Sequence, residues 1–248
     1  MHTTLHAASH SDSGDKRPFN EDRVLTKQYT VLNEAWGMFL VADGSGGANK
    51  PASQMIMDRL SAWWEGELAT ILSFPHGTGA VLASLNETIA EINKKIFQTQ
   101  PEKRTGSTLS LLLIMDDKYI ISHVGDSRIY AINRESGIRQ LTEDHSYVAA
   151  QVAAGHLTAE GAKWHPKRNV ITRSIGMRPT VSMFTQTGVV GQNDSFLLCT
   201  DGFHKLITDD EVLNIVLSRE LQTPEKVQAL RNSIKSAHDN ISIILVTQ

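Results

Sequence analysis

The chain has 248 residues, of which 40% are hydrophobic and 21% charged, and this ordinary globular balance excludes a largely disordered protein. A net charge of −3 at neutral pH shows no basic excess, so neither nucleic acid nor an anionic membrane is an expected partner. The length suits one domain of an α/β or all-β kind, or two small ones.

Taken in chain order, the hydrophobic pattern predicts blocks of strands separated by pairs of helices. Short apolar runs rich in β-branched residues indicate strands, and apolar residues three or four positions apart indicate helices. The strands are expected at residues 24–30, 37–42, 108–115, 119–124, 128–133, 181–190, 195–200 and 241–246, the first and sixth being the weaker signals. The helices are expected at residues 51–64, 78–97, 148–154, 209–217 and 224–234.

Local signals support the helix boundaries. Pro51 suits a first helical turn because its missing N–H would have no partner there, and Thr223 followed by Pro224 starts the last helix in the same way. Thr208 or Asp209 is the candidate N-cap of the helix before it.

The order of the elements indicates how the strands pair. The strands come in blocks rather than in strict alternation with helices, which favours antiparallel sheets covered by helices over a doubly wound parallel sheet. The dipeptides Asp116-Asp117 and Gly125-Asp126 predict tight links between neighbouring antiparallel strands.

The segment at residues 144–176 differs from the rest of the chain. It contains one short alanine-rich helix, a glycine that ends it, and several basic residues. We expect a surface excursion near the functional site, with its basic side chains in solvent. Contact with an acidic or phosphorylated partner is the alternative for these residues.

Cysteine content and the N-terminal residues bear on location. The single cysteine, Cys199, excludes a disulfide within the chain, and its apolar surroundings favour a buried structural role over a reactive thiol. The first seventeen residues lack the apolar core of a signal peptide, and no apolar stretch approaches the ~20 residues that span a bilayer. We therefore expect a cytoplasmic protein.

Four aspartates share one placement, at the end of an apolar run. Asp43 and Asp201 each follow such a run, Asp126 follows a third, and Asp239 comes just before a fourth. A strand that begins at an acid, antiparallel to strands that end at acids, brings all of these acids to one edge of the sheets. We therefore expect a cluster of carboxylates.

Clustered carboxylates repel one another unless a cation neutralises them. Oxygen ligands without an accompanying cysteine or histidine set suit hard ions such as Mg²⁺ or Mn²⁺. Each Asp-Gly pair taken alone is also a common turn signal. The conjunction of the four acids favours the metal site, and so does the segment 14–22, which places Arg17 near further acids.

Eight segments of the chain resemble the type 2C metal-dependent serine/threonine protein phosphatases, in the order found in that family and over nearly the whole length. They are GDKRPFNED (14–22), VADGSGG (41–47), GSTLSLLLI (106–114), GDSRIY (125–130), LTEDHS (141–146), RNVITRSIG (168–176), DSFLLCTDGF (194–203) and HDNISIILV (238–246). The resemblance implies an α+β fold, with two packed antiparallel sheets flanked by helix pairs. It also implies one catalytic domain over residues 1–248, with the segment 144–176 matching the family's flap.

The resemblance assigns metal ligands by position. Asp43 would bridge two Mn²⁺ or Mg²⁺ ions, with the Gly44 carbonyl on one of them, and Asp201 and Asp239 would complete the other. Asp126, together with Asp201, would serve a third and weaker ion.

The resemblance also implies a reaction. Glu21 and Asp22 would hold metal-bound waters, and Arg17 would grip the substrate phosphate, which a guanidinium binds in bidentate fashion. A water bridging two cations would hydrolyse phosphoserine or phosphothreonine in proteins. A short member of this kind resembles the bacterial branch, which opposes Ser/Thr kinases, so the expected partners are such a kinase or its targets. Position 45 is serine where some relatives carry a histidine, so no general acid is assigned.

Two rival functions remain open at this point. The first is a catalytically silent, phosphatase-like binding module, which the presence of all four aspartates argues against. The second is another two-metal hydrolase, acting on nucleic acid or nucleotides, which would need a basic groove or stacking aromatics. The net charge of −3 and an aromatic content of 6% argue against that function.

Overall fold

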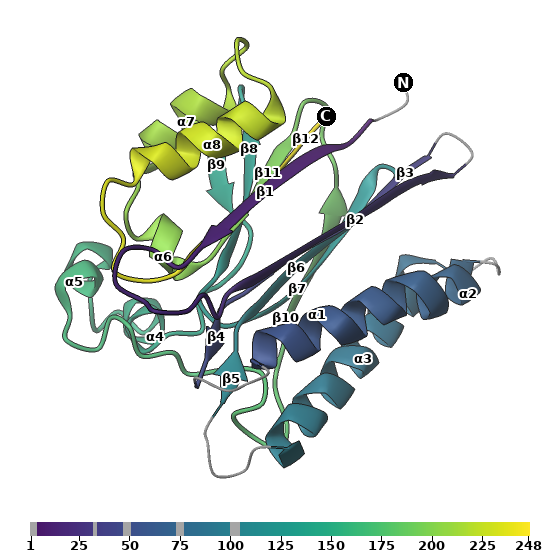
Figure 1. Ribbon diagram of the computed structural model, residues 1–248, viewed down its shortest axis with the longest axis horizontal. Helices are drawn as coiled ribbons and strands as arrows, with labels where there is room; N and C mark the ends of the chain where they lie inside the picture. The colour runs from purple at the N-terminus through teal and green to yellow at the C-terminus, as the bar shows by residue number, and fades with distance from the viewer. Residues whose placement is uncertain (1–3, 32–33, 47–50, 73–76, 100–104) are drawn as a thin grey trace.

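The computed structural model describes residues 4–31, 34–46, 51–72, 77–99 and 105–248, and two five-stranded antiparallel sheets form its centre (Figure 1). The first sheet has the order β1 (His6–Asp12), β12 (Ile241–Thr247), β11 (Ser195–Cys199), β8 (Arg128–Asn133), β9 (Gly137–Gln140). The second has the order β10 (Phe184–Val189), β7 (Lys118–Val124), β6 (Leu109–Met115), β3 (Glu34–Ala42), β2 (Arg23–Val31). A two-stranded ribbon, β4 (Gly44–Ser45) and β5 (Gly106–Ser107), extends from the second sheet.

Helix pairs cover the outer faces of the two sheets. On the first sheet lie α7 (Asp209–Val216) and α8 (Thr223–Ser233), and on the second lie α1 (Ala52–Ala62) and α3 (Thr78–Thr99). A π-helical turn (Trp63–Leu68) continues α1 into α2 (Ala69–Leu72), and the short helices α4 (Tyr147–Ala153), α5 (Ala159–Trp164) and α6 (Asp201–His204) lie at one end of the sheets. The expected α+β fold of two packed antiparallel sheets with flanking helices is confirmed.

The period of two along each strand explains how one sheet contacts two layers. In β3, Met38 and Leu40 pack under α1 and α3, whereas Phe39 and Val41 point into the layer between the sheets. Because both faces are covered, the strands read as continuous apolar runs rather than as alternating ones. All seven residues of β6 are buried for this reason.

The cap of α7 matches the local signal in the sequence, whereas α8 begins one residue earlier than expected. The Thr208 side chain accepts a hydrogen bond from the backbone N–H of Glu211, and the Glu211 carboxylate accepts one from the backbone N–H of Thr208, which makes a capping box for α7. In α8 the helix begins at Thr223, Pro224 lies in the first turn, and the cap is the preceding residue, Gln222.

One predicted strand link is wrong. Asp116-Asp117 does join the paired strands β6 and β7, but Gly125-Asp126 joins β7 to β8, which belong to different sheets. At this turn Gly125 has a φ of 116°, a conformation that favours glycine, and an added Cβ would lie 2.5 Å from Thr108 Cγ2, so glycine lets the chain pass close to Thr108 as it leaves the second sheet. As a result, Asp126 lies at the junction of the two sheets.

Strand β1 was not expected from the sequence. Its residues, HAASHSD, show no apolar alternation, yet all seven pair with β12 at the edge of the first sheet. None of the described helices is long and apolar enough to cross a membrane.

Candidate active site

The two sheets bring their acid-bearing ends to one edge. Asp43 follows β3 and Asp126 follows β7, and these two strands run in the same direction because β6 lies antiparallel between them. Asp201 follows β11 and Asp239 precedes β12, which pair antiparallel, so these two acids also lie at the same end. The geometry expected from the apolar runs is therefore present.

Backbone contacts fix the position of Asp43. Its N–H donates to the Thr108 hydroxyl at 2.9 Å, and its carbonyl accepts from the Thr108 N–H at 2.9 Å. At the next residue, Gly44, an added Cβ would lie 2.5 Å from the Glu21 carbonyl oxygen, so only glycine lets these two segments approach. The segment carrying Glu21 and Asp22 is thereby held against Asp43.

The loop between Asp239 and β12 packs equally tightly against α6. A Cβ at Gly202 would lie 2.0 Å from the Asn240 carbonyl oxygen. The Asn240 side chain accepts from the Glu21 N–H at 2.9 Å and donates to the carbonyls of Ser13 and Phe19, both at 3.1 Å. Asn240 thus joins the segment 14–22 to the end of the sheet that carries Asp201 and Asp239.

Asp22 is the most buried acid of the group, with 1% of its surface exposed. One carboxylate oxygen accepts from the Thr200 hydroxyl at 2.8 Å, and in the described part of the chain the other, Oδ1, has no hydrogen-bond partner. A buried carboxylate oxygen without a hydrogen-bond partner destabilises the folded state, so we expect a ligand or a water molecule to bind this atom.

The acids perturb one another's ionisation. Burial raises the pKa of Asp22 to about 7 and of Asp126 to about 6, and it raises the pKa of Asp43 well above its ordinary value. The charges of neighbouring acids add to all three shifts. The charges of four other acids all raise the pKa of Asp43, so the five carboxyl groups form one electrostatic unit. The other four are Asp22, Asp126, Asp201 and Asp239.

Two basic side chains pair with the acids. The Arg17 guanidinium donates from Nε and Nη2 to the two oxygens of Asp239, each at 2.9 Å. The Lys205 ammonium donates to Asp201 Oδ2 at 2.6 Å. Burial alone would raise the pKa of Asp201, but the charge and hydrogen bond of Lys205 outweigh it, so this pKa is lowered.

The chemistry of the donor atoms suits hard divalent cations, although the side chains of the described residues do not converge on a single ion position. The donors are carboxylate oxygens, and one of them, Asp22 Oδ1, is buried without a hydrogen-bond partner among the described residues. A divalent cation stabilises negative charges that lie close together and away from solvent. Across the described ranges, no three acidic, histidine or cysteine side chains converge as ligands of one ion. The acids have Arg17 and Lys205 as counter-charges instead.

The segment 144–176 is tied to the same edge at both ends. Arg128 of β8 forms a bidentate pair with Asp144, with distances of 2.9 and 2.7 Å. Isolated bridges join Ser146 to Ile171 and Ser107 to Ile175. The basic side chains of this segment include Lys167, whose ammonium lies 4.7 Å from the ring centre of Tyr147.

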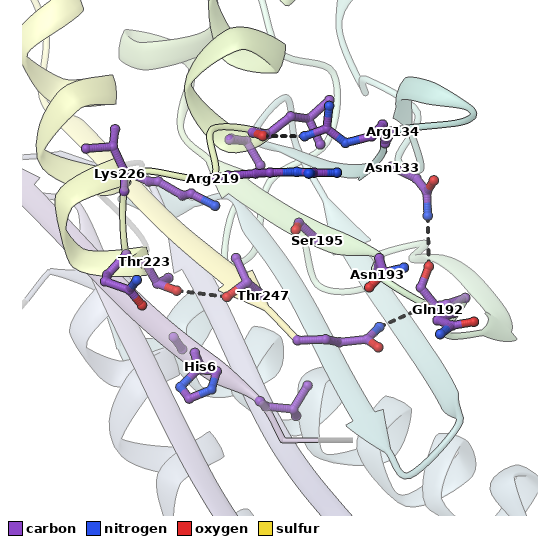
Figure 2. Close-up of a pocket in the computed structure, with 18 of the residues that line it drawn as sticks. His6, Asn133, Arg134, Gln192, Asn193, Ser195, Arg219, Thr223, Lys226 and Thr247 are labelled. Carbon is purple, nitrogen blue, oxygen red and sulfur yellow. Dashed lines mark hydrogen bonds between the residues drawn. The ribbon is translucent and has the colours of Figure 1, made fainter. Parts of the chain in front are cut away.

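A cavity of about 1180 Å³ lies at the other end of the first sheet (Figure 2). His6 of β1 and Thr247 of β12 line it, and these strands meet the acid-bearing edge at their opposite ends. The hydrogen bond between the Thr223 and Thr247 hydroxyls, at 2.8 Å, closes one side. None of the residues lining this cavity belongs to the acid cluster.

Sequence reasoning missed several residues that build the site. Thr108, Thr200 and Asn240 hold acids or their loops in place, and Lys205 and Asn169 meet beside Asp201. Asn240 had a local signal, since it follows Asp239 directly. Thr200 likewise precedes Asp201 directly, and Lys205 follows Asp201 by four residues. Thr108 and Asn169 lie within segments that resemble the family, but the sequence does not indicate which groups their side chains contact.

Comparison with known proteins identifies the family. A family model described as protein phosphatase 2C matches residues 8–237. The protein phosphatase PhpP of Streptococcus pneumoniae is 34% identical over 242 residues, which cover 96% of this chain and 95% of PhpP.

Solved structures agree. The serine/threonine phosphatase Stp1 from Staphylococcus aureus superposes with a TM-score of 0.86 at 28% identity, over 99% of this chain and 96% of Stp1. The catalytic domain of the serine threonine protein phosphatase PstP, solved with two manganese ions, has a TM-score of 0.79 at 25% identity, over 98% of this chain and 97% of PstP. The expected class of enzyme, a protein serine/threonine phosphatase, is confirmed, and the chain belongs to the protein phosphatase 2C family.

Proposed function

We propose that this protein phosphatase hydrolyses phosphoserine and phosphothreonine in proteins in a reaction that depends on Mn²⁺ or Mg²⁺, and that it opposes a Ser/Thr kinase. The observation that carries the proposal is the electrostatic unit of five acids around Asp43 at one edge of the sheets. Phosphate monoesters hydrolyse very slowly unaided, so an enzyme that acts on them must stabilise concentrated negative charge.

The metal ligands in this proposal are Asp43, the Gly44 carbonyl, Asp201 and Asp239, which would hold two ions. When bound, such ions supply positive charge to the phosphoryl oxygens and make a water molecule acidic enough to act as nucleophile. The manganese complex of PstP supports this ion count for a relative.

The remaining groups position water and substrate. The unpartnered Oδ1 of Asp22 can accept a hydrogen bond from a water in the site, and Glu21 lies on the same segment. Arg17 already binds a carboxylate in bidentate fashion, which is the geometry a guanidinium uses for phosphate. We propose that the substrate phosphate takes the place of Asp239 on this guanidinium.

The bond changes follow from this arrangement. The water oxygen forms the new bond to phosphorus, the ester P–O bond breaks, and a proton goes to the departing serine or threonine oxygen. We assign no residue as the source of that proton. Ser45, at the position where some relatives carry a histidine, is exposed and donates to the Gly106 carbonyl at 3.3 Å.

Partners and location follow from the same proposal. Phosphorylated proteins are the substrates, with a Ser/Thr kinase or its targets as the expected partners. A cytoplasmic location and the lack of nucleic-acid or membrane partners stay predictions.

The test is release of phosphate from a phosphothreonine peptide, first with a chelator and then with added Mn²⁺ or Mg²⁺. We expect activity only with metal, and a loss on the order of 100-fold or more in Asp201→Asn, because a charged oxygen ligand becomes a neutral amide. Asp210→Asn is the matched control, since Asp210 is an exposed acid on α7 outside the site.

A folded wild-type protein without activity under either metal would contradict the proposal. The silent binding module would then be the better account. Activity that persists in the chelator would contradict the metal dependence while leaving the phosphatase assignment in place.

A further inference from the structure

One basic side chain stands between acids at the position where the family resemblance places a third metal ion. Lys205 Nζ donates to Asp201 Oδ2 at 2.6 Å and to Asn169 Oδ1 at 3.2 Å, and it lies 3.8 Å from Asp126 Oδ2. An ammonium has three N–H donors, so a single lysine can point one N–H toward each of these three oxygens. They come from three separate parts of the chain: α6, the segment 144–176 and the loop between β7 and β8.

A simpler reading is an ordinary pair between Lys205 and Asp201, which are four residues apart. Such pairs on exposed helix surfaces contribute little to stability. Here, however, the two acids are not on an exposed surface, because their side chains are only 7% exposed in Asp126 and 18% exposed in Asp201. Buried carboxylates are costly without a partner of opposite charge. Burial and the charge of Asp201 both raise the pKa of Asp126, and the charge of Lys205 acts in the opposite direction and lowers it.

The residues around Lys205 do not fit a divalent ion at this position. Mg²⁺ needs a near-octahedral set of oxygen ligands around a full double charge, and Mn²⁺ prefers the same oxygen geometry. The ammonium already uses the Oδ2 atom of Asp201 and faces Oδ2 of Asp126. An ion held by the same two carboxylates would lie within a few ångströms of this positive charge and be repelled by it.

We propose that Lys205 is a built-in cation that takes the place of the third divalent ion between Asp126 and Asp201. The inference rests on the proposed function, because it concerns the same acid cluster. It makes the chain a two-ion enzyme at this edge. It also gives Lys205 a second role, since its hydrogen bond to Asn169 fastens the segment 144–176 to the acids without a metal.

The test counts bound ions rather than activity. Metal-free protein is titrated with Mn²⁺ by calorimetry, and the ions retained are counted by equilibrium dialysis with elemental analysis. We expect two ions per chain for the wild type and for Lys205→Arg, which keeps the positive charge. Lys205→Met has a side chain of similar length without the charge, and we expect it to bind a third, weaker ion.

Lys27→Met is the matched control. Lys27 also pairs with a carboxylate at 2.6 Å, that of Glu65, but it does so on β2, outside the acid cluster. We expect it to bind two ions. Far-ultraviolet circular dichroism establishes that each variant is folded, and Lys205→Gln replaces Lys205→Met should the latter fail to fold.

Three bound ions in the wild type, or only two in a folded Lys205→Met or Lys205→Gln, would overturn the inference and leave the proposed function intact. A wild type that binds no Mn²⁺ and does not hydrolyse the phosphothreonine peptide would overturn both. The two failures are therefore distinguishable by the wild-type measurements alone.

Discussion

His123 is an ionisable ring buried inside the second sheet. It is 0% exposed on β7, hydrogen bonds through Nδ1 with the Ser110 hydroxyl at 2.9 Å, and contacts the carbonyls of Gly125 and Glu143 through Nε2, each at 3.1 Å. Two carbonyl acceptors at Nε2 fit a ring that carries its proton there. In the neutral ring Nδ1 then accepts from the Ser110 hydroxyl, so both nitrogens have partners without a charge. Burial accordingly lowers the pKa of His123 to about 4.

This ring makes the fold sensitive to acid. The unfolded pKa, about 6.5, lies above the folded one, so between these values the unfolded chain binds more protons and stability falls as pH falls. At pH values above about 6.5 the contribution of the neutral ring is fully present. His123→Gln should therefore reduce the loss of unfolding free energy between pH 6.5 and pH 4.5 by about 2 kcal/mol.

Urea denaturation at a series of pH values measures this difference, and comparing two pH values removes any constant cost of the substitution. His156→Gln is the control, the same change at an exposed ring. If the free energy of unfolding fell equally between pH 6.5 and pH 4.5 in His123→Gln and in the wild type, the His123 ring would not be the cause of the acid sensitivity.

At the scale of elements, one ion pair joins β8 to the start of the segment 144–176. The side chains of Arg128 and Asp144 are 27% and 15% exposed, and Asp144 also accepts from the Gln140 amide at 3.0 Å. Burial would raise the pKa of Asp144, but the hydrogen bonds and charge of Arg128 hold it below its ordinary value. The Asp144 carboxylate therefore stays ionised, and its two hydrogen bonds with Arg128 fix the orientation of both side chains.

Removing one partner leaves the other charge uncompensated. We expect Arg128→Met to lower the free energy of unfolding by about 3 kcal/mol, and the double variant Arg128→Met with Asp144→Leu to recover part of that loss. Arg59→Met is the control, because Arg59 pairs with Glu67 at 2.8 Å on a more exposed surface, and there we expect a cost of about 0–1 kcal/mol. Equal costs at the two arginines, measured by chemical denaturation, would contradict a structural role for the buried pair.

At the scale of the molecule, we expect the buried layer between the two sheets to make them unfold together. Phe39 of the second sheet and Phe196 of the first belong to one buried cluster, at 0% and 1% exposure. Three of the four tryptophans belong to the second sheet or its helix layer: Trp36 lies on β3, and Trp63 and Trp64 are buried in the π-helical turn after α1. The fourth, Trp164, is 78% exposed at the end of α5. Tryptophan fluorescence therefore reports mainly on the second sheet when a residue of the first sheet is substituted.

Phe196→Ala should cost about 3–5 kcal/mol, because it leaves a cavity where the two sheets meet. We expect tryptophan fluorescence and far-ultraviolet circular dichroism to report the same, lowered midpoint, since residues 1–248 are predicted to form one domain. Separate transitions, with the fluorescence midpoint unchanged, would show that the two sheets unfold independently and would contradict that prediction.

Many elements could be predicted because their cause is local. A strand with both faces covered is apolar at most of its positions, as in β6 and β12, and in a helix with one covered face the apolar residues recur every three to four positions, as in α3. β1 has no such cause. Its polar residues become a strand because their backbone groups pair with β12, 230 or more residues away in sequence for most of the strand.

The family, the layered α+β fold and the set of acids could all be predicted from the order of residues, because buried strands and the acids at their ends leave patterns among neighbouring residues. Three features could not be predicted in this way: that Gly125-Asp126 joins strands of different sheets, that Arg17 pairs with Asp239 across 222 residues, and that Lys205 lies between Asp126 and Asp201. A pairing of charges depends on the distance and burial of groups that the chain brings together only when both sheets have closed on each other.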